Sequence, residues 1–241
     1  MAKQKLIVDI GNTRIKWAFA GNEDAGTVHF ADSLTDHIPF DACQQAIISS
    51  VRGKPNLSFL NPEKNIIFFS HTTPIPLRLD YQTPHTLGPD RLAAAVGASG
   101  LFPNQTVLVI DAGTCITYDL VDKQGVFRGG AISPGIQLRM RAMHEFTSSL
   151  PDIKNEWKTL SDHFPGRSTK DCMAGGVIQA MIHEIEGYIC LAKKEFGDLS
   201  VILTGGDAGF FESKLKETIF VRQNLVMTGL NRILKHNEVD K

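Results

Sequence analysis

The chain has 241 residues, of which 42% are hydrophobic and 21% are charged, so it has the composition of a globular protein that buries a core without disulfides. Its formal net charge of -1 and the lack of a long charged run argue against a nucleic-acid surface, and no segment has the ~18 uninterrupted apolar residues of a membrane span. Four scattered cysteines without metal-ligand spacing favour reduced thiols, and we expect a cytoplasmic protein that binds neither nucleic acid nor membranes.

Turn residues and hydrophobic periodicity predict alternating strands and helices, which favours an α/β fold. Strands are expected at residues 6–10, 15–20, 27–30, 46–50, 66–70, 107–111, 115–122, 125–133 and 201–206. Helices are expected at residues 88–100, 134–145, 170–194, 210–217 and 225–235, and the first of these opens with Pro89 at its first position.

The long helix expected at residues 170–194 and the irregular stretch at residues 151–166 could each have a functional or a purely structural role. The long helix carries apolar residues at helical spacing, which predict a stripe facing the core rather than a cofactor site. These residues are Val177, Met181, Ile185, Tyr188 and Ile189. Residues 151–166 are the least periodic stretch, and we expect them to form a mobile loop or a cap.

One turn occurs twice, in VDIGNTRIK from Val8 and in VIDAGTCITYD from Val109. In both, an apolar strand ends in Asp, a spacer and Gly, and the two aspartates, Asp9 and Asp111, lie 102 positions apart. That period is too long for a solenoid and indicates a duplicated domain. Pro103-Asn104 is the best boundary, so we expect lobes at residues 1–104 and 105–241.

The chemistry of these turns suits phosphate. Gly11 lets a ligand approach the backbone, while the amides of residues 11–13 and the Thr13 hydroxyl can donate to phosphate oxygens. Asp9 can hold Mg²⁺ directly or through water, with Lys16 as a nearby cation. The same residues also form plain hairpin turns. The second copy and a third strand ending in a glycine pair, VILTGGDA, favour a nucleotide site in which the adenine or ribose lies against the glycine pair.

Neither a Walker A loop nor a Rossmann glycine fingerprint is present. The layout resembles the actin, Hsp70 and sugar-kinase superfamily, in which two ribonuclease-H-like lobes grip ATP between paired hairpins. The resemblance implies an α/β fold of two such lobes, with the nucleotide cleft between them. At this level it does not identify a substrate.

Four stretches narrow the resemblance: DIGNTRIK, GPDR, DAGTCITYD and GGAISPG. Their order and spacing resemble type III pantothenate kinase over nearly the whole chain. That family implies ATP-dependent phosphorylation of pantothenate to 4'-phosphopantothenate, the first step of coenzyme A biosynthesis, in a homodimer whose pantothenate pocket draws on both subunits. Another small-acid or sugar kinase of the superfamily, and a non-catalytic transcriptional accessory factor of the same fold, remain alternatives.

The resemblance also assigns roles to individual residues. It implies that ATP contacts Asp9, Ile10, Gly11, Asn12, Thr13, Arg14, Ile15, Lys16 and Thr114. It implies that pantothenate contacts Tyr81, Gly88, Pro89, Asp90, Arg91 and Thr169. Asp90 would accept the substrate's proton, and Asp111 would ligate a monovalent cation, K⁺ or NH₄⁺.

Two of these positions have local alternatives, and the sequence departs from the family at a third position. The dipole of a helix start stabilises an acidic residue such as Asp90 without any catalytic role. Arg91 would bind the pantothenate carboxylate or would pair with a nearby Asp for structural reasons. Cys115 stands where the family usually has Ala, and its apolar neighbours predict a small packing residue rather than a nucleophile.

Overall fold

The computed structural model describes residues 4–22, 24–35, 37–60 and 64–238. The chain divides into two compact units. Unit 1 contains Met1–Val107, Asp119–Gly129 and Asn224–Lys241, and unit 2 contains Leu108–Tyr118 and Gly130–Gln223. The lobe boundary after residue 104 stays a prediction.

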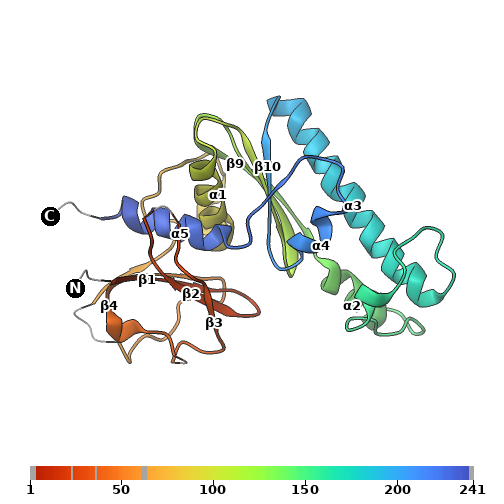
Figure 1. The fold of residues 1–241 in the computed structure, drawn as a ribbon, viewed down its shortest axis with the longest axis horizontal. Helices are drawn as coiled ribbons and strands as arrows, with labels where there is room; N and C mark the ends of the chain where they lie inside the picture. The colour runs from red at the N-terminus through yellow and green to blue at the C-terminus, as the bar shows by residue number, and fades with distance from the viewer. Residues whose placement is uncertain (1–3, 23, 36, 61–63, 239–241) are drawn as a thin grey trace. The chain divides into compact units, whose positions relative to one another are not determined.

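The first sheet has five strands in the order β3-β2-β1-β4-β5. Figure 1 labels β1, β2, β3 and β4. β1 pairs antiparallel with β2 and parallel with β4. The strands are β1 (Gln4–Ile10), β2 (Ile15–Phe19), β3 (His29–Ala31), β4 (Cys43–Ser50) and β5 (Asn65–Phe68). Because side chains alternate across a strand, Leu6, Val8 and Ile10 enter an apolar cluster on one face of the sheet, and Ile7 and Asp9 point to the other face.

The second sheet has six strands in the order β11-β10-β7-β8-β9-β6. They are β6 (Arg78–Leu79), β7 (Val107–Ala112), β8 (Cys115–Val121), β9 (Val126–Pro134), β10 (Ser200–Thr204) and β11 (Phe220–Val221). Read from β9 to β11, the order 9-8-7-10-11 repeats the order 3-2-1-4-5 of the first sheet, with β6 added at one edge. The predicted duplicated α/β fold is thereby confirmed.

The helices occur where they were expected, with one change. They are α1 (Pro89–Leu101), α2 (Ile136–Glu145), α3 (Thr169–Phe196), α4 (Ala208–Glu212) and α5 (Leu225–His236), with short 3-10 turns at Phe40–Ala42, Pro84–Thr86 and Trp157–Thr159. The helix expected at 210–217 is α4, which is shorter and starts earlier because Asp207 begins its first turn by accepting from the amide of Phe210.

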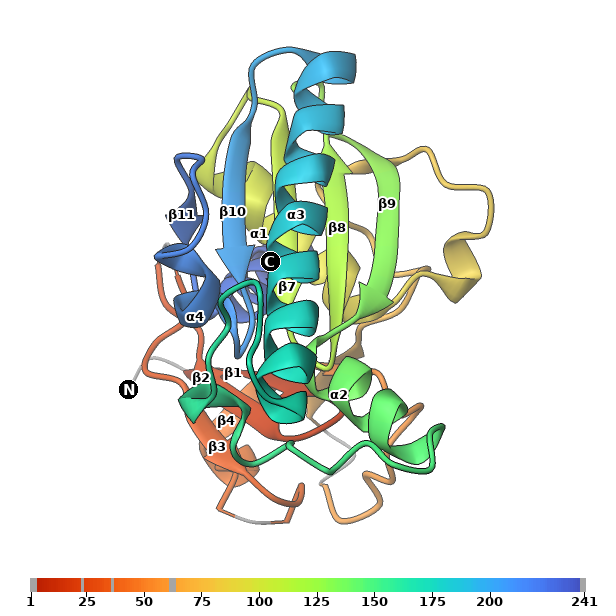
Figure 2. The same ribbon diagram turned by 90° about the vertical axis from the view of Figure 1, so that its right-hand side faces the viewer.

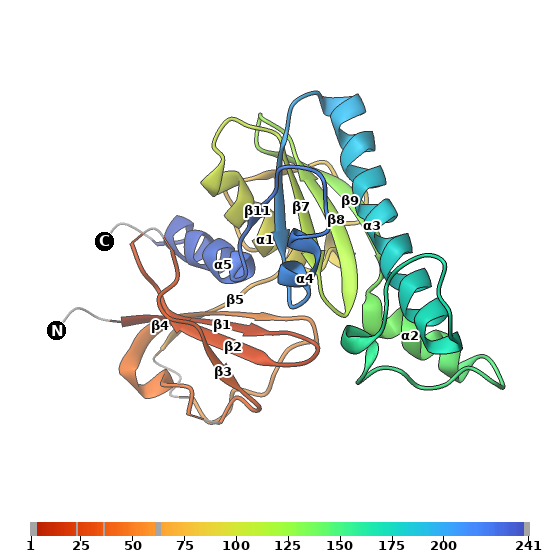
Figure 3. The same cartoon turned by 45° about the vertical axis from the view of Figure 1, so that its right-hand side comes forward.

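In unit 1, α1 and α5 lie side by side and pack against β1 and β4 (Figure 3). The two helices approach at Gly97 and Gly229, where a β-carbon on Gly229 would overlap the carbonyl oxygen of Ala93. Glycine is therefore required at this crossing. Close packing here fixes α1, whose first turn carries Asp90, on α5, and α5 in turn packs on β1, the strand that carries Asp9.

In unit 2, α3 runs along the sheet formed by β7, β8, β9 and β10 (Figure 2). Of the predicted stripe, Val177, Met181, Ile185 and Ile189 are buried, which confirms its core-facing role, and Tyr188 stacks on Tyr118 with 4.1 Å between ring centroids. Among the described residues, no helix combines the length and the apolar character needed to cross a membrane.

Residues 151–166 pack onto unit 2. Ile153 and Trp157 are buried, and the Trp157 ring meets Phe210 of α4 edge-on with 5.0 Å between centroids. Two buried apolar side chains anchor this stretch, so it covers part of the unit as the cap alternative implied.

Candidate active site

The first repeated turn is a tight hairpin between β1 and β2. The amide of Gly11 donates to the carbonyl of Arg14 at 3.1 Å, and a β-carbon on Gly11 would lie 3.2 Å from the same oxygen. Asn12, Thr13 and Arg14 are exposed at the tip. Arg52, which follows β4, donates from Nη2 to the carbonyl of Asn12 at 2.7 Å. Sequence reasoning missed this second cation beside the hairpin.

Asp9 is the buried acid of the first hairpin, with only 6% of its surface exposed. Burial raises the pKa of its carboxyl from 3.8 to about 6; Lys16, its cross-strand partner, lowers the pKa, the Asp90 carboxylate raises it, and Ser49 on β4 lowers it. Its Oδ1 has no hydrogen-bond partner among the described residues. A buried oxygen left without a donor is costly unless it meets a ligand, and a Mg²⁺ ion or its water fits this position.

Asp90 lies in the first turn of α1, one residue after Pro89. Its Oδ1 accepts from the amide of Arg91 at 2.8 Å, which is the stabilisation expected at a helix start. A β-carbon on Gly88 would lie 2.6 Å from this carboxylate oxygen, so a larger residue at position 88 would displace the Asp90 side chain. Electrostatic coupling between Asp90 and Asp9 places both acids in one region of unit 1.

Arg91 is buried and forms an ion pair with Asp119 of β8. Its Nε and Nη2 donate to Asp119 Oδ1 at 3.0 and 2.5 Å, and the two side chains are 8% and 1% exposed. The structural alternative for Arg91 is thus realised, with Asp119 as a partner that sequence reasoning had not named. Tyr81 also lies close to Arg91. Burial lowers the pKa of the Arg91 guanidinium, but its interactions with Asp119 and, to a smaller extent, with Tyr81 raise that pKa above its ordinary value.

We expect Arg91→Ala to lower the free energy of unfolding by about 3–5 kcal/mol, because it leaves a carboxylate buried without its guanidinium. Arg91→Lys should recover part of the loss, since lysine keeps the charge but not the forked contact. Urea unfolding measures both. The exposed pair Arg141–Glu145 supplies the control, and Arg141→Ala should cost at most about 1 kcal/mol. An Arg91→Ala protein as stable as the Arg141→Ala protein would contradict this prediction.

The second repeated turn brings several glycines together in unit 2. The amide of Gly113 donates to the carbonyl of Cys115, and the amide of Gly135 donates to the carbonyl of Thr114, both at 3.0 Å. The backbone of Gly205 has a φ of +95°, and a β-carbon there would overlap Asp111 Oδ1. The end of β10 is therefore packed on the end of β7. The sequence predicts that the glycine pair of VILTGGDA lies close to the second repeated turn.

Two other predicted positions are less constrained. Thr169 is the first residue of α3 and is exposed. Cys115 is exposed at the start of β8, so the expectation that it packs in the core was wrong. Cys115 is the first residue of β8 and its side chain is exposed to solvent. Apolar neighbours in the sequence do not show which face of a strand a residue occupies.

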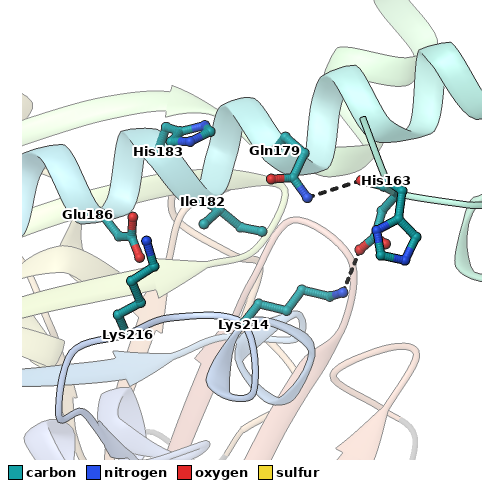
Figure 4. A pocket seen from close by; sticks show the side chains of 8 residues that line it. His163, Gln179, Ile182, His183, Glu186, Lys214 and Lys216 are labelled. Carbon is teal, nitrogen blue, oxygen red and sulfur yellow. Dashed lines mark hydrogen bonds and ion pairs between the residues drawn. The ribbon is translucent and has the colours of Figure 1, made fainter. Parts of the chain in front are cut away.

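Unit 2 also contains a polar pocket of about 270 Å³ that includes none of the predicted site residues (Figure 4). It is lined by Asp162, His163, Gln179, Ile182, His183, Glu186, Lys214 and Lys216. Lys214 Nζ donates to the Asp162 carboxylate at 2.5 Å, and Gln179 Nε2 donates to the Asp162 carbonyl at 3.0 Å (Figure 4). These bonds fasten the end of the 151–166 segment to α3 and to the turn after α4.

Comparison with known proteins decides the family. The model of the type III pantothenate kinase family matches residues 5–190. The chain belongs to the type III pantothenate kinase family. It is 42% identical to the type III pantothenate kinase of Phocaeicola vulgatus, over 97% of this chain and 98% of that protein. It is 39% identical to that of Cytophaga hutchinsonii, over 96% and 99%.

Solved structures agree on the fold of this type III pantothenate kinase family member. A protein named as a conserved Baf family transcriptional activator from Campylobacter jejuni is 21% identical with a TM-score of 0.56, over 96% of this chain and 97% of that one. The ethanolamine utilization protein EutJ from Carboxydothermus hydrogenoformans is 15% identical with a TM-score of 0.51, over 97% and 90%. At such identities the likeness shows the fold alone.

The acids of the site suit a metal that is shared with a phosphate ligand. The described residues contain no group of three or more His, Cys, Asp or Glu side chains that could hold an ion by themselves. Mg²⁺ in kinases is bound through one or two carboxylates together with substrate phosphates and water. Asp9, with its unpaired Oδ1, fits that arrangement.

Proposed function

We propose that this protein transfers the γ-phosphoryl group of ATP to pantothenate, forming 4'-phosphopantothenate for coenzyme A synthesis. Membership of the type III pantothenate kinase family supports the reaction. The observation that carries the residue assignment is the pair of acids in unit 1. A buried Asp9 with an unpaired oxygen and an Asp90 at the start of α1 are electrostatically coupled, as a phosphate-metal site next to a proton acceptor requires.

In the proposed mechanism, the hairpin amides at Asp9–Lys16 and the Lys16 ammonium bind phosphate oxygens, and Thr114 adds a contact from the second hairpin. Mg²⁺ would be held by Asp9 and would neutralise phosphate charge. Asp90 accepts a hydrogen bond from the pantothenate hydroxyl, aims it along the line of transfer and takes its proton. Because the transition state is loose, the proton is taken late, and a base as weak as a carboxylate can still accept it.

For pantothenate itself, we propose contacts with Tyr81, Gly88, Pro89, Arg91 and Thr169. The contact between Tyr81 and Arg91 supports a shared role at the substrate's carboxylate. Because Asp119 already takes the Nε and Nη2 donors of Arg91, the pair would hold the guanidinium rigid rather than leave it free to swing.

The finer assignments belong to the same proposal. Asp111 would ligate K⁺ or NH₄⁺, and its Oδ1 lies close to Gly205, as does the carbonyl oxygen of Ala112. We propose a cytoplasmic homodimer that binds neither nucleic acid nor membranes. Exposed apolar residues of unit 2, including Ile132 and Leu191, support a contact with a second copy. Membership of the type III pantothenate kinase family favours a pantothenate kinase over a transcriptional accessory factor or a sugar kinase.

The test is turnover of pantothenate by the purified protein, with ADP release coupled to NADH oxidation through coupling enzymes that do not need K⁺. We expect activity with ATP, Mg²⁺ and K⁺, and a several-fold lower rate when Na⁺ replaces K⁺. Asp111→Asn should remove the difference between the two salts. Equal rates in K⁺ and Na⁺ would contradict the cation assignment alone. No phosphorylation of pantothenate, alongside turnover of another hydroxy acid or sugar, would contradict the proposed substrate.

A further inference from the structure

A hydrogen-bonded cluster in unit 2 surrounds the carboxylate of Glu184 on α3. The Tyr118 hydroxyl of β8 donates to Glu184 Oε1 at 2.9 Å. Arg139 of α2 donates from Nη2 to Oε2 at 2.5 Å, and the Ser133 hydroxyl of β9 donates to the same oxygen at 3.3 Å. Burial and the nearby Glu184 raise the pKa of Tyr118, so its hydroxyl stays a neutral donor. One carboxylate thus ties two strands and one helix to α3.

The same cluster reaches the second repeated turn through Arg139. Its Nε donates to the carbonyl of Pro134 at 2.7 Å, and its Nη2 also donates to the Ser133 hydroxyl at 2.9 Å. The next residue, Gly135, donates its amide to the carbonyl of Thr114 at 3.0 Å. A β-carbon on Gly135 would overlap the carbonyl of Gly113, so the Ser133–Gly135 turn packs directly on the Gly113–Thr114 turn.

Thr114 is therefore supported from two sides by one carboxylate. On one side, the chain runs from Thr114 into β8, where Tyr118 is bound to Glu184. On the other side, Gly135 holds the Thr114 carbonyl, and Arg139 holds the turn that ends in Gly135. The ion pair between Arg139 and Glu184 is about four-fifths buried, where charge-assisted hydrogen bonds are strong.

We infer that Arg139, oriented by Glu184, is a positioning residue that fixes the Ser133–Gly135 turn and, through it, the main chain at Thr114. This inference rests on the proposed function in one respect, the contact of Thr114 with ATP. Neither side chain touches the phosphate; both act through the turn. A displacement of about 1 Å at a group that positions a phosphate is enough to cost on the order of 100-fold in rate.

The experiment compares Arg139→Ala, Arg139→Lys and Glu184→Gln with Arg141→Ala, which removes the same charge from the same helix at an exposed pair. We expect Arg139→Ala to raise the KM for ATP and the Kd for MgATP about tenfold while the KM for pantothenate changes less than twofold. Arg139→Lys should recover part of the affinity, because lysine keeps the ion pair but cannot bond Glu184 and Pro134 together. Arg141→Ala should match the wild type.

A double variant with Arg139→Ala and Glu184→Gln should lose little more than Arg139→Ala, since the Arg139–Glu184 contact is already broken and the glutamine oxygen can still accept from the Tyr118 hydroxyl. Wild-type affinity for MgATP in Arg139→Ala would overturn the inference. The inference would also be overturned if Arg139→Ala lost activity equally in every kinetic parameter, and if that loss equalled the fraction of the variant that urea unfolding shows to be unfolded under assay conditions. If the wild type binds MgATP but does not phosphorylate pantothenate, the proposed function fails, while the difference in MgATP affinity still decides the role of Arg139.

Discussion

Asp90→Asn is expected to lower kcat for pantothenate phosphorylation by about 100- to 10,000-fold, the usual contribution of a positioned general base. The asparagine keeps the shape of the carboxylate, and its Oδ1 can still accept from the amide of Arg91, so the start of α1 should be intact. What is lost is the ability to take the proton of the pantothenate hydroxyl. Steady-state kinetics with the coupled ADP assay measure the effect.

Two controls separate a catalytic role from a structural one. The Kd for MgATP should change less than threefold, because the phosphate-binding hairpin is untouched. Asp198→Asn, at an exposed acid after α3, should leave kcat unchanged. If Asp90→Asn turns over at the wild-type rate, Asp90 is not the proton acceptor, and the helix dipole alone accounts for an acid at that position.

Local chemistry explains why the sequence predicted much of the site. The hairpin at Asp9–Lys16, the start of α1 at Gly88 and the Gly113–Thr114 turn depend on glycines and turn residues next to one another in the chain. The strands β1 and β7, which lead into the two repeated turns, are buried apolar runs with a clear sequence signal. Two-residue edge strands such as β6 and β11 carry no periodicity, and they were missed.

Partners that lie far apart in the sequence were missed for a different reason. Arg91 and Asp119 are separated by 28 positions, Asn12 and Arg52 by 40, and Arg139 and Glu184 by 45. An arginine in a single sequence shows neither its burial nor its partner. The ion pair of Arg91 with Asp119 could therefore be recognised only in the folded chain.

Asp9→Asn is expected to change activity and stability in opposite directions. Activity should fall about 100-fold or more, because the variant loses the charge proposed to hold Mg²⁺. Stability should rise, because the wild type buries a carboxylate whose pKa is about 6 instead of 3.8. A pKa difference of this size corresponds to at most about 3 kcal/mol of unfolding free energy. We expect a gain of about 1–3 kcal/mol at about pH 8, measured without nucleotide or Mg²⁺.

The gain should depend on pH in a defined way. Between pH 3.8 and about 6, folded protein keeps a proton on Asp9 that the unfolded chain has released, so wild-type stability falls as the pH rises through this range. The asparagine of the variant has no such proton, so the difference between the two proteins should be near zero at about pH 4, grow up to about pH 7 and then stay level. Urea unfolding at a series of pH values across this range tests this. Two outcomes would contradict this prediction: a stability difference that does not depend on pH, or a variant less stable than the wild type at about pH 8. Either would mean that the wild-type carboxylate already has a partner in the folded protein, so that its oxygen is not the place where a cation binds.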